Sequence, residues 1–245
     1  MFTIPKPPWT LLGKTLESKV RKALFTFDLL AGVDRLAIAL SGGKDSLTLL
    51  FLLHAILGRG VKPVPLVAIH VSGEFSCGSS VNKQMLSSMC EELGVPLFLE
   101  TSEQKADSLR CYSCSRERRR LLFERAKKEQ CSHIAFGHHK DDATETLLLN
   151  MLHKAEFASM LPKVPMKKYG ITILRPLIFL EEKEILRFAT KENFLRTTCK
   201  CPRGALSQRN KTRQILEYME RSFPRARSNL FLAGSQYGSK KALSP

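Results

Sequence analysis

A short polar turn between two apolar segments constrains the fold of this chain more than any other feature. Residues 36–40 are apolar, the turn at 41–46 reads SGGKDS, and a second apolar run extends from Leu47 to Leu57. This order predicts a buried strand that ends in a loop and passes directly into a helix. Such a loop presents unpaired N–H groups at the positive end of the helix dipole, so we expect an anion site there.

The residue types in this turn suit a phosphate. The two glycines let the backbone approach closely, the two serines add hydroxyl donors, and Lys44 adds a positive charge. The carboxylate of Asp45 makes sense beside phosphates if it holds a cation or orients a reacting group. The turn is not the G-x-x-x-x-G-K-S/T loop, because the first glycine is missing and Asp45 follows Lys44. The alternative is a strand–helix turn that binds no ligand.

The net charge predicts the kind of partner, and the apolar pattern argues against a membrane or secreted protein. The chain has 245 residues, 39 Lys and Arg against 23 Asp and Glu, and a formal net charge of +16. This excess predicts a polyanionic partner, although a solvated basic helix face would also account for part of it. The longest apolar run is too short to span a bilayer, and the first ten residues lack the apolar run of a signal peptide. We therefore expect a cytoplasmic protein with no membrane partner.

Strand and helix patterns alternate along most of the chain. We predict strands at 35–40, 64–71, 95–100, 132–137 and 171–177, and helices at 11–30, 46–58, 79–93, 115–129, 142–153, 181–193 and 208–222. This alternation indicates an α/β fold with a doubly wound, mostly parallel sheet and helices on both faces. Such sheets bind ligands beyond the carboxyl ends of their strands. A basic tail follows, and we expect it to be mobile beyond Gly234.

A second strand also ends in a polar turn. The predicted strand at 132–137 closes on Gly137, and the helix that follows opens with Asp141, Asp142 and Glu145. These carboxylates would reach the same sheet edge as the SGGKDS turn, where Mg²⁺ takes a few protein oxygens together with nucleotide phosphates. The alternative is helix capping without a metal, because acidic residues in a first turn complement the dipole.

The cysteine spacing suggests metal ligands. Seven cysteines argue against a secreted disulfide framework. Cys111 and Cys114, predicted in a loop, form a C-x-x-C pair, and Cys199 and Cys201 form a C-x-C pair. Spacing alone permits a zinc site made of all four thiolates. The other three cysteines fit ordinary structural roles.

Several segments in sequence order resemble the TtcA-type tRNA 2-thiocytidine synthetases of the PP-loop ATP pyrophosphatase superfamily. They are SGGKDS at 41–46, CYSCSR at 111–116, GHHKDDATETLLLNML at 137–152, LRPL at 174–177 and a late cysteine. The resemblance covers about residues 15–225. It implies cleavage of ATP between the α- and β-phosphates, transfer of AMP to the C2 oxygen of cytidine 32 in the tRNA anticodon loop, and replacement of that oxygen by sulfur.

The resemblance also implies the site residues. ATP would be held by Ser41, Gly42, Gly43, Lys44, Asp45, Ser46 and Gly137. The catalytic residues would be Lys44, Asp45, Asp141 and Asp142, of which the three aspartates would also bind Mg²⁺. A [4Fe-4S] cluster would be held by Cys111, Cys114 and Cys201, with Cys199 in reserve. The tRNA would contact Arg116, Arg118, Arg119, Arg120, Arg209, Lys211 and Arg213.

Further expectations follow from this resemblance. Residues 1–30 would form a basic helical segment, 31–195 the ATP-binding domain with the inserted C-x-x-C pair, and 196–245 a basic tRNA-contacting segment. A cysteine desulfurase system would supply the sulfur, and a homodimer is left open. The rival functions are a tRNA 2-thiouridine synthetase of the same superfamily and a zinc-stabilised RNA-binding protein without catalysis. His138 and His139 fit either a nucleotide contact or a structural role.

Overall fold

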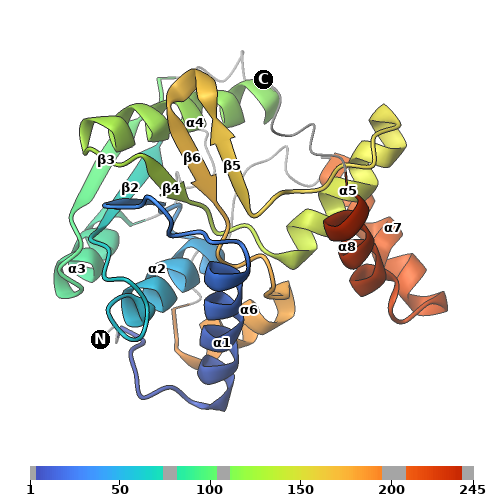
Figure 1. The fold of residues 1–245 in the computed structure, drawn as a ribbon, viewed down its shortest axis with the longest axis horizontal. Helices are drawn as coiled ribbons and strands as arrows, with labels where there is room; N and C mark the ends of the chain where they lie inside the picture. The colour runs from blue at the N-terminus through green and yellow to red at the C-terminus, as the bar shows by residue number, and fades with distance from the viewer. Residues whose placement is uncertain (1–3, 74–81, 104–110, 195–207, 239–245) are drawn as a thin grey trace.

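The computed structural model of the chain describes residues 4–73, 82–103, 111–194 and 208–238. Within these residues one six-stranded sheet carries helices on both faces (Figure 1). The strands are β1 (Leu36–Ala39), β2 (Leu66–Ser72), β3 (Leu97–Thr101), β4 (His133–Ala135), β5 (Lys163–Met166) and β6 (Ile171–Leu174). The helices are α1 (Leu11–Thr26), α2 (Lys44–Ile56), α3 (Lys83–Glu92), α4 (Cys111–Lys128), α5 (Lys140–Lys154), α6 (Glu182–Lys191), α7 (Gln208–Ser222) and α8 (Ala226–Tyr237).

The strand order confirms the doubly wound sheet. Neighbouring strands follow the order β3-β2-β1-β4-β6-β5, and every pair is parallel except β5 with β6. The chain moves outward from β1 to β2 and β3, then crosses back to β4 on the other side of β1. The order therefore reverses between β1 and β4, and in open α/β sheets ligands bind at the carboxyl ends of the strands at such a point.

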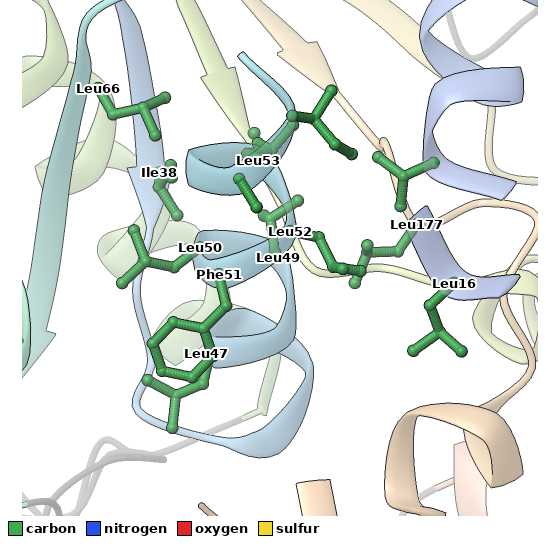
Figure 2. Packing of buried hydrophobic residues seen from close by; sticks show 14 of the residues in the cluster. Leu16, Ile38, Leu47, Leu49, Leu50, Phe51, Leu52, Leu53, Leu66 and Leu177 are labelled. Atoms are coloured by element: carbon green, nitrogen blue, oxygen red, sulfur yellow. The ribbon is translucent and has the colours of Figure 1, made fainter. Parts of the chain in front are cut away.

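Each face of the sheet has its own apolar core. Leu36 and Ile38 of β1 pack with α2 on one face, while Ala37 between them joins the core under α4 on the other. Helix α2 is buried on almost every side, as the crowding of its leucines with Leu16 of α1 and Leu177 illustrates (Figure 2). This burial fixes the helix that begins at the SGGKDS turn.

Several predicted elements differ from the structure. Strand β5 was not expected, because it is short and contains Pro165, which only an edge strand tolerates well. The loop predicted for the cysteine pair is wrong, since α4 already begins at Cys111. Helix α1 ends at Thr26 rather than at residue 30.

The expectation for the chain beyond Gly234 also needs correction. Helix α8 continues to Tyr237, with Phe231 and Gly234 buried. The last residues, 239–245, lie outside the part that the structure describes. No helix among the described residues is both long and apolar enough to cross a membrane.

Candidate nucleotide and thiolate site

A cavity of about 340 Å³ lies where the strand order reverses. The ends of β1, β2 and β4 form its apolar wall, and the polar wall comes from the SGGKDS turn, the residues after β4 and the first half of α4. The lining residues are Ala39, Leu40, Ser41, Asp45, Ser46, Ile69, Val71, Ser115, Arg118, Arg119, Leu122, Phe136, Gly137, His138 and Asp142. An apolar wall opposite a few convergent polar groups is typical of a small-molecule site.

The SGGKDS turn is held in shape by its own hydroxyl groups. Gly42 has a positive φ of 81°, a conformation that glycine adopts without strain. Its N–H donates to the Ser46 Oγ at 3.1 Å, and the same hydroxyl donates to the carbonyl of Gly43 at 3.0 Å. The Ser41 Oγ lies 3.0 Å from that of Ser46. These hydrogen bonds fix the conformation of the turn. Helix α2 begins at Lys44, so the N–H groups of its first turn lie at the edge of the cavity.

Gly137 lets the second polar turn lie against the first. A Cβ at this position would come within 2.9 Å of the Asp45 carbonyl carbon and 3.0 Å of the Ser46 nitrogen. Both of these contacts are with backbone, which cannot move aside as a flexible side chain could. The predicted association of the two turns at one sheet edge thus depends on this missing side chain.

Lys44 is held by two carboxylates. Its Nζ lies 3.0 Å from the Asp45 Oδ1 and 3.1 Å from the Oε1 of Glu182 at the start of α6. Burial alone would lower the pKa of Lys44, but the two carboxylates outweigh this and raise it above its ordinary value. The ammonium therefore stays protonated beside the cavity. The sequence reasoning missed Glu182, which lies far from the turn in sequence.

His139 lies at the centre of the three predicted metal-binding aspartates. The imidazole is buried, with nitrogens 3.8 Å from Asp45, 3.6 Å from Asp141 and 3.4 Å from Asp142. Burial lowers the pKa of His139, and the three carboxylates together raise it above its ordinary value. The three carboxylates thus favour the protonated form of the imidazole.

The three aspartates are not equivalent. Asp45 and Asp142 line the cavity. The carboxylate of Asp141 instead accepts hydrogen bonds from the Glu182 N–H at 2.7 Å and from Arg227 of α8 at 3.0 Å. Burial raises the pKa of Asp141, but the contacts with His139, Glu182 and Arg227 lower it to about 2.

The positions of the three aspartates indicate which of them could bind Mg²⁺. Among the described residues, no group of three or more His, Cys, Asp and Glu side chains has the arrangement of a metal site. Mg²⁺ often uses only one or two carboxylates beside substrate phosphates, and Asp45 and Asp142 can provide that set from the cavity wall. The donors therefore fit the ion through two of the three predicted ligands.

The arginines of α7 point back to the site. Arg213 donates to Glu145 at 2.9 Å and lies 3.5 Å from Glu182, while Arg209 lies 3.4 Å from Asp142 and 3.3 Å from Glu145. Glu145 is only 1% exposed, and its burial raises the pKa of the carboxyl despite both arginines. Two of the predicted tRNA contacts thus serve as counter-ions of α5. Lys211, between them in sequence, is exposed.

The arginines of α4 have different surroundings. Arg118 and Arg119 line the cavity, and Arg118 also donates to the carbonyl of Val71 at 3.2 Å. Arg116 and Arg120 lie on the exposed surface. Arg120 is paired with two glutamates of its own helix at 2.8 and 2.7 Å, so much of its charge is compensated locally.

The cysteine pair belongs to the helix that lines the cavity. Cys111 and Cys114 stand at positions i and i+3 of the first turn of α4, a spacing that places two residues on one helix face. Cys114 is half-buried, and the next residue, Ser115, lines the cavity. A thiol in the first turn of a helix, such as that of Cys114, suits the role of a thiolate ligand. The Cys111 side chain, Cys199 and Cys201 lie outside the described part of the structure.

His138 was left unassigned by the sequence and lies on the cavity wall. Its ring stacks on Phe136 with centroids 5.5 Å apart, and its Nδ1 accepts a hydrogen bond from Arg175 at 3.3 Å. Burial and the adjacent guanidinium hold the pKa of His138 well below its ordinary value. The imidazole is therefore neutral at physiological pH. Arg175 belongs to the LRPL segment, and its contact with His138 gives that segment a place at the site.

Comparison with known proteins identifies the family of the chain. A family model described as the PP-loop domain matches residues 13–217. The tRNA-cytidine(32) 2-sulfurtransferase of Geobacter sulfurreducens is 32% identical over 90% of this chain and 88% of its own length. The protein of the same name from Paracoccus denitrificans is 34% identical, over 91% of this chain and 77% of its own length.

A solved structure shares the fold. The U34-tRNA thiolase NcsA from Methanococcus maripaludis, with its [4Fe-4S] cluster, superposes with a TM-score of 0.76 at 22% identity. The match covers 96% of this chain and 88% of that one.

Proposed function

Since the chain belongs to the PP-loop family and shares about a third of its residues with tRNA-cytidine(32) 2-sulfurtransferases, we propose that it is an ATP-dependent tRNA thiolation enzyme. One observation carries the proposal. A single cavity is lined by the SGGKDS turn, by Gly137 and Asp142, and by the helix whose first turn holds Cys111 and Cys114. A phosphate-binding turn and a helix that carries a C-x-x-C pair, both at one cavity, fit activation of an oxygen followed by its replacement with sulfur.

In the proposed reaction the C2 oxygen of cytidine 32 attacks the α-phosphorus of ATP. The new O–P bond forms as the bond between the α- and β-phosphates breaks, and pyrophosphate leaves with the electron pair. Hydrosulfide-level sulfur (HS⁻) then attacks C2, AMP leaves with the former cytidine oxygen and the C–O bonding electrons, and loss of the sulfur-bound proton gives the thiocarbonyl; sulfur delivered as a persulfide would first have to be reduced by two electrons from a thiol reductant. The activation is needed because an amide-like carbonyl oxygen is otherwise a very poor leaving group.

The chain's own residues would hold the phosphates through this step. The turn offers hydroxyl and backbone donors, and Lys44 would leave Glu182 to meet the charge that develops on the separating phosphates. The guanidinium of Arg118, already on the cavity wall, can meet the same charge from the α4 side. The apolar strand ends would take the adenine.

Two bound groups complete the proposal. Asp45 and Asp142 would hold Mg²⁺, which supplies charge compensation to the phosphates. Cys111, Cys114 and Cys201 would hold a [4Fe-4S] cluster, which supplies an iron that can carry a sulfur atom. Cys199 is kept as the reserve ligand.

The tRNA supplies the acceptor base. Arg116 and Arg119 on α4 and Lys211 on α7 are predicted cations whose side chains are exposed, so the tRNA backbone could reach them. The base must leave its stack to enter the cavity, as in other enzymes that act on a nucleobase. A cysteine desulfurase system remains the predicted sulfur donor, and cytoplasmic location and a homodimer remain predictions.

Two measurements test the function. Purified protein should release pyrophosphate from ATP only when tRNA is present, and Lys44→Ala and Asp45→Ala should abolish this release. Full activity in either variant would contradict the assignment. Cells without the gene should lack 2-thiocytidine in their tRNA nucleosides by mass spectrometry, whereas loss of 2-thiouridine would point to the rival thiolation.

A further inference from the structure

The end of α7 and the turn into α8 carry an exposed surface that the proposed catalytic site does not use. Tyr218 and Phe223 are each 69% exposed, and Arg221 and Arg225 are exposed beside them. We call these four residues the α7 tip. The helix pair that bears it packs against α5 at one side of the sheet (Figure 1).

Helix α7 has two chemically distinct faces. Its inner face contains the buried Thr212 and Leu216, and Arg209 and Arg213 on that side meet the carboxylates near the site. The charge of these inner arginines is therefore compensated. Arg221 of the tip, by contrast, forms no ion pair with any residue in the described ranges, and the same holds for Arg225 beyond the helix end.

The turn that presents Phe223 is ordered by its backbone. The Phe223 N–H donates to the carbonyl of Met219 at 2.8 Å, and the Ala226 N–H donates to the carbonyl of Phe223 at 2.8 Å. The aromatic ring thus stands in solvent on a fixed turn between two arginines, rather than at a frayed end. A partner that covers this ring removes apolar surface from water, which contributes favourably to the free energy of binding.

We propose that the α7 tip binds the nucleotides of the substrate tRNA that flank the modified base. The inference rests on the proposed function and adds a contact surface to it. Exposed aromatic rings stack on unpaired bases, and arginines between them contact phosphates, which is how proteins hold single-stranded RNA. The chain's net charge of +16 favours the same polyanionic partner.

The position of the tip along α7 suits this role. Arg213 lies at the site and Arg221 follows it eight positions later, which corresponds to about 12 Å along the helix axis. Nucleotides that flank a base held in the cavity would reach the tip by running along α7. Helix α7 would join the reaction site to the flanking RNA through its two faces.

Two double variants test the proposal, each with a matched control. Tyr218→Ala with Phe223→Ala removes the rings, and its control is Phe25→Ala on α1, where the ring is 67% exposed. Arg221→Gln with Arg225→Gln removes the charges, and its control is Lys167→Gln with Lys168→Gln, two exposed lysines before β6. For each protein the dissociation constants for tRNA and for ATP are measured over a range of salt concentrations.

We expect the aromatic double variant to bind tRNA about tenfold more weakly or worse, because stacking is a large part of single-strand affinity. The arginine double variant should lower the salt dependence, with the slope of log K against log salt reduced by about 1.4 for two lost phosphate contacts. Affinity for ATP should not change in either variant, which shows that the site remains folded. The controls should bind both ligands as the wild type does.

Other results would overturn the proposal. Unchanged tRNA affinity in both double variants would remove the α7 tip from the RNA surface and leave the proposed function intact. Unchanged affinity together with a smaller mass by light scattering would assign the tip to contact with a second copy of the chain. A wild-type protein that binds no tRNA would contradict the proposed function itself.

Discussion

The ammonium of Lys44 on α2 lies 3.1 Å from the carboxylate of Glu182 on α6, although 138 positions separate the two residues. Glu182 also lies 3.5 Å from Arg213, which donates to Glu145. Positive and negative side chains therefore alternate from Lys44 in the SGGKDS turn to Arg213 on α7. In the structure Lys44 therefore faces a protein carboxylate. A bound triphosphate would have to compete with that carboxylate for the same cation.

This competition gives a first prediction. Glu182→Gln should bind ATP about two- to fivefold more tightly, because the substitution removes a partly exposed competitor and a negative charge near the phosphates. Fluorescence titration with an ATP analogue would measure the change. Glu181→Gln is the matched control, since Glu181 pairs with Lys140 and Lys183 instead. Weaker binding in Glu182→Gln would show that the carboxylate positions Lys44 for ATP.

Gly137 gives a second prediction. Gly137→Ala should destabilise the protein by about 1–3 kcal/mol, because the added Cβ meets backbone atoms of Asp45 and Ser46 at 2.9 and 3.0 Å. ATP binding should weaken as well, since the two turns are forced apart. Urea unfolding and nucleotide titration would measure both effects. Gly43→Ala is the comparison, because its Cβ would meet only the Ser41 hydroxyl at 3.5 Å. Equal loss of stability in the two variants would argue against the close approach at Gly137.

The third prediction concerns pH. The pKa of Asp141 is lowered to about 2 in the folded protein, so its ionised carboxylate stabilises the fold above the unfolded pKa and loses this effect as pH falls from about 4 to 2. Asp141→Asn should therefore lower the free energy of unfolding by about 2 kcal/mol at pH 7. The gap from wild type should narrow below pH 4 in urea titrations without magnesium.

The control for this experiment is Asp34→Asn, because the Asp34 side chain is 96% exposed and pairs only loosely with Lys62 at 3.4 Å. It should unfold like the wild type across the same pH range. A stability gap for Asp141→Asn that stays constant down to pH 2 would mean that its effect does not come from ionisation.

The fourth prediction concerns the thiols. Cys114→Ala should lose most of the iron and the visible absorption of anaerobically purified protein. Cys131→Ala is the matched control, because burial raises the pKa of the Cys131 thiol to about 11 and keeps it protonated within the core. Iron content and absorption spectra would compare the two. A colourless wild-type protein with one equivalent of zinc would instead favour the zinc-stabilised alternative.

Local sequence pattern was enough to predict the parallel sheet and the meeting of the two polar turns. Strand β1 and helix α2 could be identified because their apolar runs flank a turn whose residue types allow few other structures. Strand β5 could not, since an edge strand of four residues with a proline has no clear periodicity. The first turn of α4 was also missed, because cysteines and serines are weak helix formers.

The partners of the site residues depend on tertiary contacts that periodicity does not encode. Glu182 follows Lys44 by 138 positions and Arg227 follows Asp141 by 86, so no local pattern connects these partners. Composition likewise did not predict the partners of the basic residues of α7. Composition predicted cations for an external polyanion, and the structure places Arg213 against a buried glutamate of the chain itself.

The contact between Arg213 and the buried Glu145 limits where the chain can be truncated. Glu145 is sealed from solvent, and the guanidinium groups that balance it arrive only after residue 207. A protein ending at residue 195 would keep the four signature segments before the late cysteines but would leave this carboxylate without its counter-ions, so we expect such a truncation to be insoluble rather than merely slow. Recombination between relatives should accordingly exchange α5 and α7 together, as one inherited pair.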